Sequence, residues 1–319
     1  TGCGDLFDVT LMPVMGEVVY SRGRLGDYST GFWSEADRTQ EVVEPGYYSV
    51  PLTRYDILAE MTATERGGLH RYTFPEGEDA AIILDLVHGG CFDRPEDLFA
   101  EAVSDTRVVG RRHSWGWSNN QKVYFVIEFS KPFESFEPIT EYGYYYRINF
   151  KTVEGEQIGI KVALSSTSPE GAELNFNEEV AKKEFDQVRK ETYSKWAKEL
   201  NKIRIYGASE EQMTRALILS HLTVIYIKQS LGRLSALCGC VVAATGSSCG
   251  ITYLMGGGYE EVTRAVKNMI ANLTGMICDG AKPSCAMKCA SGVSTAVVSA
   301  LMAMNNRCVK SVEGIIDDD

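Results

Sequence analysis

The chain has 319 residues, which is long enough for two domains with separate hydrophobic cores. Its mean hydropathy of −0.14 and its 24% of charged residues are typical of a soluble globular protein. The formal net charge of −11 excludes nucleic acid and anionic membranes as partners, because an acidic surface is repelled by both. No basic segment followed by an apolar run opens the sequence, so it predicts no signal peptide. Thr1 is not a natural start, so an upstream export signal is left open.

The composition changes abruptly near residue 214. Before Thr214 there are 23 basic and 36 acidic residues, and from Thr214 onward there are 9 and 7. Of the 32 aromatic residues, 29 precede this point, whereas seven of the nine cysteines follow it. We therefore predict a domain boundary here, in an α+β chain divided into residues 1–175, 176–213 and 214–319.

Residues 1–175 are predicted to form an antiparallel β-sandwich. Apolar, β-branched and aromatic runs of strand length occur at residues 47–52, 80–88, 121–130, 142–150 and 158–166. The last two runs are predicted to pair as a hairpin, with Gly155 in the turn between them. Several short strands separated by Gly, Pro and Asp turns favour an antiparallel sandwich.

The hydrophobic period changes from Asn177 onward. Apolar side chains then recur at spacings of three and four, at Phe185, Val188, Thr192, Trp196 and Leu200. This spacing predicts one amphipathic helix of about six turns, with Asn177 as its N-cap. Residues 176–213 are therefore interpreted as a linker helix and a short strand, laid against the sandwich or joining it to the next domain.

Residues 111–121 are a first candidate for ligand binding. They place His113, Trp115 and Trp117 beside small and amide residues. Flat indole faces suit the C–H faces of sugar rings, while His, Asn and Arg hydrogen-bond to hydroxyls. The structural alternative is a hairpin with one indole buried and the other half exposed.

Residues 62–74 are a second candidate. They offer Glu65 and Arg66 close to further basic side chains. The structural alternative is a strand whose polar face is merely solvated, and the residues alone favour that alternative.

Several segments resemble the N-terminal part of glycoside hydrolase family 92, a family of exo-acting α-mannosidases. They include TGCGDLFDVTLMP (1–13), TATERGGLHRYTFP (62–75) and WGWSNNQKVYFVIEFSKPF (115–133), in one order within residues 1–213. The resemblance implies an N-terminal β-sandwich, a linker helix and a C-terminal (α/α)6 barrel. It also implies a sugar site between sandwich and barrel that uses a Ca²⁺ ion.

The resemblance makes Trp115, Trp117 and His113 candidate sugar-binding residues, with Glu65 and Arg66 as sugar-hydroxyl or loop-supporting groups. In that family the general acid, the general base and the calcium ligands belong to the barrel, and no barrel sequence follows residue 213. An inverting glycosidase needs two carboxylates about 6.5–9.5 Å apart with water between them. This chain is therefore expected to bind a mannose-containing glycan rather than to hydrolyse it.

From Thr214 the sequence predicts a partial all-α domain. Residues 215–229 are apolar almost all round, as in a helix enclosed by others, and residues 259–278 and 284–304 are also predicted helices. Residues 234–259 carry no charge over 26 residues, which is long enough to span a bilayer. Their many Gly, Ser, Thr and Cys residues and the lack of an aromatic belt favour a buried helix instead, so no membrane partner is expected.

The cysteines of this half include a CxC pair, Cys238 and Cys240, and the segment CDGAKPSC from Cys278 to Cys285. Buried lone cysteines are usually small hydrophobes, and this is the expectation for Cys249, Cys289 and Cys308. The glycine and proline of CDGAKPSC allow a turn that brings two sulfurs toward one centre. From spacing alone, zinc, a disulfide and an iron–sulfur cluster all stay open.

The segments GRLSALCGCVVAATG (232–246), KNMIANLTGMICDGAKPSCAMK (267–288) and SGVSTAVVSALMAM (291–304) resemble the C-terminal region of the iron–sulfur L-serine dehydratase alpha and L-cysteine desulfidase family, over residues 217–319. The resemblance implies a [4Fe–4S] cluster and serine or cysteine as substrate. It implies Cys238, Cys278 and Cys285 as ligands, with Cys240 as the alternative to Cys238. The family's further cysteine, in a Gly-Cys-Thr-Glu context, has no counterpart in residues 1–213, so a complete lyase site is not expected.

Three hypotheses follow. The chain is a carbohydrate-binding part of an α-mannosidase joined to a lyase fragment, or an iron–sulfur lyase fragment with a foreign N-terminal module, or an artefactual junction without activity as a unit. The first half suggests an exported, periplasmic protein, whereas the second half suggests a cytoplasmic one. Helix faces that lack their family's partner segments are expected to be exposed and to self-associate.

Overall fold

The structure is a computed structural model that describes residues 8–89, 93–116, 119–139, 141, 144–202, 206–232, 235–278 and 284–317. The chain divides into two compact units, Thr1–Ile203 and Arg204–Asp319. The compositional break at Thr214 lies ten residues after this division, inside helix α3 (Glu210–Leu231). Each unit is described below by itself.

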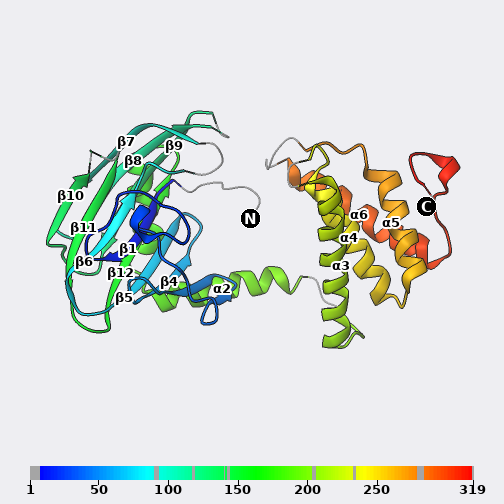
Figure 1. Cartoon of the computed structure of the whole chain (residues 1–319), viewed down its shortest axis with the longest axis horizontal. Helices are drawn as coiled ribbons and strands as arrows, with labels where there is room; N and C mark the ends of the chain where they lie inside the picture. Colours follow the sequence, from blue (N-terminus) through cyan, green and yellow to red (C-terminus); the bar gives the residue numbers. More distant parts are fainter. Residues whose placement is uncertain are drawn as a thin grey trace. The chain divides into compact units, whose positions relative to one another are not determined.

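The first unit is the predicted antiparallel β-sandwich, with its strands in two facing sheets (Figure 1). The smaller sheet has the order β1-β6-β11-β10, and the larger one the order β2-β3-β4-β5-β12-β9-β8-β7. The strands are β1 (Thr10–Met15), β2 (Val42–Glu44), β3 (Tyr47–Leu52), β4 (Ile57–Ala63), β5 (Gly67–Phe74), β6 (Gly77–Asp85), β7 (Arg94–Ala102), β8 (Arg107–Trp115), β9 (Gln121–Phe129), β10 (Ser135–Ile139), β11 (Tyr145–Thr152) and β12 (Glu156–Ser165).

The core of the sandwich lies between the two sheets. Residues Ala80–Leu84 of β6 are completely buried, and Phe125 and Ile127 of β9 face them from the larger sheet. Burial of each Ile, Leu and Phe side chain among them contributes roughly 1.5–3 kcal/mol, before the entropy of ordering the chain is subtracted. The predicted strands at 47–52, 80–88 and 121–130 correspond to β3, β6 and β9 and are confirmed.

The predicted hairpin of residues 142–150 and 158–166 is wrong in its pairing. Both segments are strands, but β11 pairs with β6 and β10, whereas β12 pairs with β5 and β9. The turn between them is as expected, because Gly155 has a φ of 72° and the N–H of Glu156 donates to the carbonyl of Val153 at 3.0 Å. This turn therefore carries the chain from one sheet to the other.

The linker is not one six-turn helix capped by Asn177. Helix α1 (Pro169–Asn175) is followed by a π-helical turn (Phe176–Val180), and helix α2 (Phe185–Leu200) begins separately after Glu184. Ser168 is the N-cap of α1, and its side chain accepts a hydrogen bond from the N–H of Gly171. Val180 and Val188 are completely buried, so both segments are anchored on the larger sheet.

The second unit consists of four longer helices: α3 (Glu210–Leu231), α4 (Gly239–Leu254), α5 (Tyr259–Leu273) and α6 (Cys285–Met304). The prediction of a buried helix within residues 234–259 is confirmed, since nine residues of α4 are buried. Helix α3 packs closely on the glycines of α4, where a Cβ added to Gly246 would lie 2.5 Å from the carbonyl oxygen of Ser220.

The prediction that residues 215–229 form an enclosed helix is wrong. In the described part of α3, Ala216 is the one buried residue, and Leu217, Leu222 and Tyr226 are 61%, 58% and 73% exposed. By length and composition alone, α6 is the one described helix that could cross a membrane. Since core helices of soluble proteins meet the same criteria, this feature carries little weight.

Candidate functional site

One end of the sandwich collects most of the polar side chains considered below. The turn at 64–66 joins β4 to β5, and β5, β12, β9 and β8 are neighbours in the larger sheet, each antiparallel to the next. Antiparallel pairing therefore places this turn at the same end of the sheet as the end of β12, the start of β9 and the end of β8. The start of β1 and the end of β6 meet at the same end, where Thr10 pairs with Asp85. We call this region the charged end.

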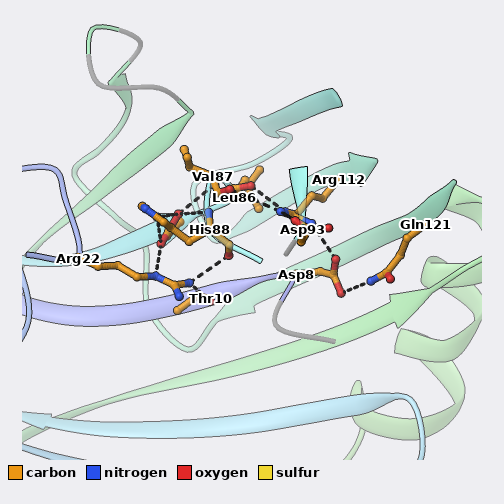
Figure 2. Close-up of polar contacts among 10 residues, drawn as sticks. Asp8, Thr10, Arg22, Leu86, Val87, His88, Asp93, Arg112 and Gln121 are labelled. Carbon is orange, nitrogen blue, oxygen red and sulfur yellow. Dashed lines mark hydrogen bonds and ion pairs between the residues drawn. The ribbon is translucent and has the colours of Figure 1, made fainter. Parts of the chain in front are cut away.

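The buried guanidinium of Arg112 contacts several segments of the charged end (Figure 2). The side chain of Arg112 is fully buried; its Nη1 donates to Asp8 Oδ1 at 2.9 Å and its Nε to the carbonyl of Leu86 at 2.8 Å. Its Nη2 also pairs with the carboxylate of Asp93. Gln121 Nε2 donates to the second oxygen of Asp8 at 2.7 Å. Burial raises the pKa of Asp8, and the positive charge of Arg112 opposes that rise.

A second group of contacts lies at the end of β6 (Figure 2). The buried carboxylate of Asp85 accepts hydrogen bonds from Arg22 Nε at 3.0 Å and from the N–H of Val87 at 2.9 Å. His88 Nδ1 lies 3.1 Å from Asp85 Oδ2 and 3.3 Å from the hydroxyl of Tyr145. In the neutral imidazole, donation from Nδ1 to Asp85 leaves Nε2 as a hydrogen-bond acceptor.

A cavity of about 590 Å³ lies beside Asp8 at the charged end. Its polar wall includes Asp8, Glu65, Arg66, Ser165 and Asn175. Carboxylate, guanidinium, hydroxyl and amide groups therefore meet around one space, with Val123 and Leu164 as apolar neighbours. This mixture of donors and acceptors suits a small, hydroxyl-rich ligand.

Glu179 fixes the turn that carries Glu65 and Arg66. Its carboxylate accepts hydrogen bonds from Thr64 Oγ1 at 2.6 Å, from the N–H of Arg66 at 2.9 Å and from Arg66 Nη1 at 3.0 Å. Burial alone would raise the pKa of Glu179, but these hydrogen bonds and the charge of Arg66 outweigh it and lower the pKa. Arg66 thus supports this turn through Glu179, although its side chain is 59% exposed. Glu65 lies exposed, 3.3 Å from Lys195 Nζ.

His113 lies on the opposite face of β8 from Arg112, because side chains alternate along a strand. Its Nδ1 is 3.5 Å from Asp97 Oδ2, and its ring packs edge-on against Tyr124 at 5.4 Å. His113 Nε2 is buried and has no hydrogen-bond partner among the described residues. Packing on the outer face of the larger sheet is therefore its observed role.

Trp115 ends β8 at the charged end and is 47% exposed. The guanidinium of Arg94 lies 5.9 Å from its ring centre. β8 and β9 pair across this turn, as in the hairpin alternative for residues 111–121, but the buried indole of that alternative is not tested. Trp117 lies outside the described residues.

The sequence reasoning missed Asp8, Asp85, His88, Arg112 and Gln121. One signal was available in β8, where Val108, Arg112 and Ser114 occupy the inward alternation and are buried. A charged residue at an inward strand position needs a buried counter-charge, and such residues cluster at functional sites. The sequence does not predict the partners of Arg112, since Asp8, for example, lies 104 residues away.

The proposed cluster ligands are only partly brought together. Leu237 and Ile277 form an isolated antiparallel bridge, so the segments carrying Cys238 and Cys278 run side by side. Cys238 is buried, Cys278 is exposed, and Cys285 begins α6. Among the described residues no three His, Cys, Asp or Glu side chains lie close enough to hold a metal ion. The described thiols do not fit a [4Fe–4S] cluster, and we derive no step through one.

The expectation for the other cysteines holds in part. Cys249 is completely buried, as expected of a small hydrophobe, and Cys308 is partly buried. Cys289 is exposed, so the expectation of a buried residue is wrong for it. Its sulfur lies 3.3 Å from that of Cys240. Burial raises the pKa of Cys240 to about 12, with further contributions from Cys289 and Cys238.

Comparison with known proteins identifies the family of the sandwich unit. Residues 1–171 match the model of the glycosyl hydrolase family 92 N-terminal domain. The chain belongs to this family. A solved family 92 α-mannosidase from Bacteroides thetaiotaomicron is 27% identical with a TM-score of 0.62, over 69% of this chain and 32% of that one. A solved inverting mannosidase of the same family and organism, at 23% identity and a TM-score of 0.52, supports the fold alone and covers 63% of this chain and 27% of that one.

The second unit has different relatives. Residues 196–319 match the model of the serine dehydratase alpha chain. A protein named UPF0597 from Bacteroides fragilis is 80% identical over 113 residues, which are 35% of this chain and 26% of that protein. A UPF0597 protein from Phocaeicola vulgatus is 81% identical over 111 residues, with the same coverage of 35% and 26%. The chain thus spans about a quarter of the length of the curated relatives it matches. As the sequence predicts, two different family models match the two parts of the chain.

Proposed function

We propose that the first unit binds α-mannose-containing glycans at the charged end and supplies one wall of a mannosidase site. The observation that carries the proposal is the cavity of about 590 Å³ lined by Asp8, Glu65 and Arg66. Its volume is in the range of small-molecule sites, about 300–1,000 Å³. The solved relative is described as an α-mannosidase, and a further structure of it holds mannoimidazole.

The chemistry of this wall suits sugar hydroxyls. Asp8 is held by Arg112 and Gln121, so its orientation is fixed before a ligand arrives. Glu65 and Ser165 offer oxygens that accept hydrogen bonds, and Arg66 offers nitrogen donors. Trp115 adds a half-exposed indole at the same end, suited to the C–H face of a pyranose ring.

We propose that this chain alone binds α-mannosides but does not hydrolyse them. Glycosidic cleavage needs a general acid and a second carboxylate on opposite sides of the bond. In the first unit the carboxylate of Asp8 is paired with Arg112, and that of Glu65 lies beside Lys195 Nζ, so both are held by basic side chains. We expect no mannose release from an α-mannoside in the presence of calcium.

Isothermal titration of the full chain with methyl α-mannoside tests the proposal. We expect saturable binding that weakens at least tenfold in Trp115→Ala and in Glu65→Gln, and does not change in Tyr193→Ala. Tyr193 is a similarly exposed aromatic residue on α2, at 52%. Equal binding of methyl β-galactoside, or wild-type affinity in both site variants, would overturn the proposal.

The alternative function concerns the second unit. We propose that it derives from an iron–sulfur L-serine or L-cysteine lyase and that it forms no complete site by itself. The observation that favours this origin is the Leu237–Ile277 bridge, which aligns the CxC segment with the start of CDGAKPSC. Anaerobic incubation of the full chain with ferrous iron and sulfide tests it. If the wild-type chain forms pyruvate from serine or cysteine and Cys278→Ser does not, the proposal that the lyase site is incomplete is wrong.

The junction itself is a third proposal. We propose that two reading frames were joined, because the compositional break falls within the continuous helix α3 and not in a Gly-, Ser- or Pro-rich linker. The two halves also suggest different compartments, exported for the first and cytoplasmic for the second. Contiguous DNA sequence across codons 205–225 tests this directly. An uninterrupted natural gene would contradict it.

A further inference from the structure

Two thiols of the second unit, those of Cys240 and Cys289, lie close together. The family resemblance offers Cys240 only as the alternative to Cys238 and does not use Cys289. Cys240 lies in the first turn of α4, and Cys289 lies one turn into α6. Their sulfur atoms are 3.3 Å apart, although 49 positions separate them in the sequence. Cys240 is partly buried and Cys289 is exposed. The pair is therefore preformed and is open to solvent on one side.

Close packing of α4 on α6 holds the two thiols together. Gly292, one turn after Cys289, lies so close to α4 that a Cβ added to it would be 3.0 Å from Cβ of Ala244. One turn farther along, Ser248 Oγ donates to the carbonyl of Ala296 at 2.9 Å. Both contacts involve small side chains, which let the two helices approach. The sulfur separation is thus set by helix packing.

We propose that Cys240 and Cys289 are a disulfide-forming site that links α4 to α6. A disulfide has an S–S length of about 2.0 Å, so the two sulfurs, 3.3 Å apart, must close by little more than 1 Å for the bond to form. The assignment also separates the roles of the CxC cysteines. Cys240 faces Cys289 on α6, whereas Cys238 lies next to the Leu237–Ile277 bridge.

The oxidant that we assign is a small disulfide such as oxidised glutathione. The thiolate of exposed Cys289 attacks one sulfur of the oxidant, and one glutathione thiolate leaves. The thiol of Cys240 then loses its proton and attacks the Cys289 sulfur, releasing the second glutathione. One protein S–S bond forms, the oxidant's S–S bond breaks, and two protein thiols are oxidised as two glutathione thiols appear.

Peptide mapping of the full chain tests the proposal. The reduced protein is incubated with oxidised glutathione, its remaining thiols are alkylated, and it is digested without reductant. We expect a Cys240–Cys289 cross-linked peptide as the main product, with two fewer alkylated thiols per chain. In Cys240→Ser we expect Cys289 to be recovered as its mixed disulfide with glutathione.

Cys249→Ser is the matched control, because Cys249 lies on the same helix and is completely buried. It should leave the Cys240–Cys289 peptide unchanged. A cross-link between Cys238 and Cys240 or between Cys278 and Cys285 as the main product would overturn the assignment. So would wild-type protein in which Cys289 accumulates as a glutathione adduct. Since the readout is a covalent mass, a variant that folds poorly is recognised by new cross-links at the other cysteines.

Discussion

At the scale of single residues, Arg112 is the centre of the charged end. It is fully buried between the carboxylates of Asp8 and Asp93. We predict that Arg112→Met lowers the free energy of unfolding by about 3–5 kcal/mol, because both carboxylates would remain buried without a counter-charge. Urea unfolding followed by tryptophan fluorescence measures this loss.

Arg111 provides the matched control for that prediction. It precedes Arg112, faces the other side of β8 and pairs with Asp97 at 2.7 Å, with both side chains well exposed. Arg111→Met should cost at most about 1 kcal/mol, because exposed ion pairs contribute little. Equal losses in the two variants would show that Arg112 is not the organising group.

Glu179 carries a prediction on pH. Its pKa is held below the ordinary value of 4.5, so its ionised form stabilises the folded state. This contribution is present above that value and is lost as the pH falls through the lowered pKa of the folded state. We therefore expect the wild-type urea midpoint to fall more steeply than that of Glu179→Gln between about pH 5 and pH 3. Parallel profiles would contradict the role of Glu179 in fixing the Glu65–Arg66 turn.

At the scale of elements, the contact of α2 with the β2–β3 turn is testable through glycine. Gly46 has a φ of 81°, and a Cβ there would lie 2.5 Å from Cγ2 of Thr192. Gly155 has a φ of 72° with nothing within 4 Å. Gly155→Ala should therefore cost only the backbone strain, about 1–2 kcal/mol.

Gly46→Ala should cost more than Gly155→Ala, by about 1–3 kcal/mol, because it adds a clash with α2 to the same strain. The difference is measured as the free energy of unfolding in urea. Hydrogen exchange should also speed up in α2 of the Gly46 variant alone. Identical values for the two variants would mean that α2 does not rest on this turn.

Local sequence patterns predict where strands and helices lie better than they predict which strands pair. The strands β3, β6 and β9 and the helices of the second unit follow from apolar runs and periodicity. The pairing of β11 and β12 does not, since a turn at Gly155 suits a hairpin as well as a crossing between sheets. The predicted apolar stripe of α2 is buried at Val188 and partly buried at Phe185, but Trp196 and Leu200 at its far end are 52% and 59% exposed. The π-helical turn before α2 has no simple sequence signal.

In the candidate site too, local patterns predict some residues, whereas contacts made by the tertiary fold are not predicted. The family resemblance predicts Glu65 and Arg66 from a motif that carries both, and both line the cavity. His113 was chosen for its residue type, but its position in β8 turns it away from Arg112 to pack on Tyr124. Asp8 and Arg112 meet only through the tertiary fold. Contacts between residues so distant in sequence are not encoded in any local pattern.

At the scale of the whole molecule, the exposed face of α3 predicts self-association of the chain. Leu217, Ile218, Leu222, Ile225 and Tyr226 are all more than half exposed. Apolar area of this kind on one helix is rarely left in water, and a second copy offers the same face. We expect the weight-average mass in sedimentation velocity to rise with protein concentration.

The variant pair Leu222→Lys and Ile225→Lys should shift the chain toward the monomer. The control is the pair Val43→Lys and Val153→Lys, which adds the same charge at exposed positions of the sandwich, 73% and 65% exposed. The control should sediment like the wild type. A wild-type chain that stays monomeric at every concentration would contradict this prediction.

The central claim is that the charged end of the sandwich is the surface that meets a mannoside. Hydrogen exchange of the full chain with and without methyl α-mannoside is the most direct test. We predict slower exchange at residues 8–10, in the 64–66 turn and at the end of β8 near Trp115. Protection at the separate cavity lined by Phe99, Glu101 and Glu173, or no protection anywhere in the sandwich, would contradict the claim.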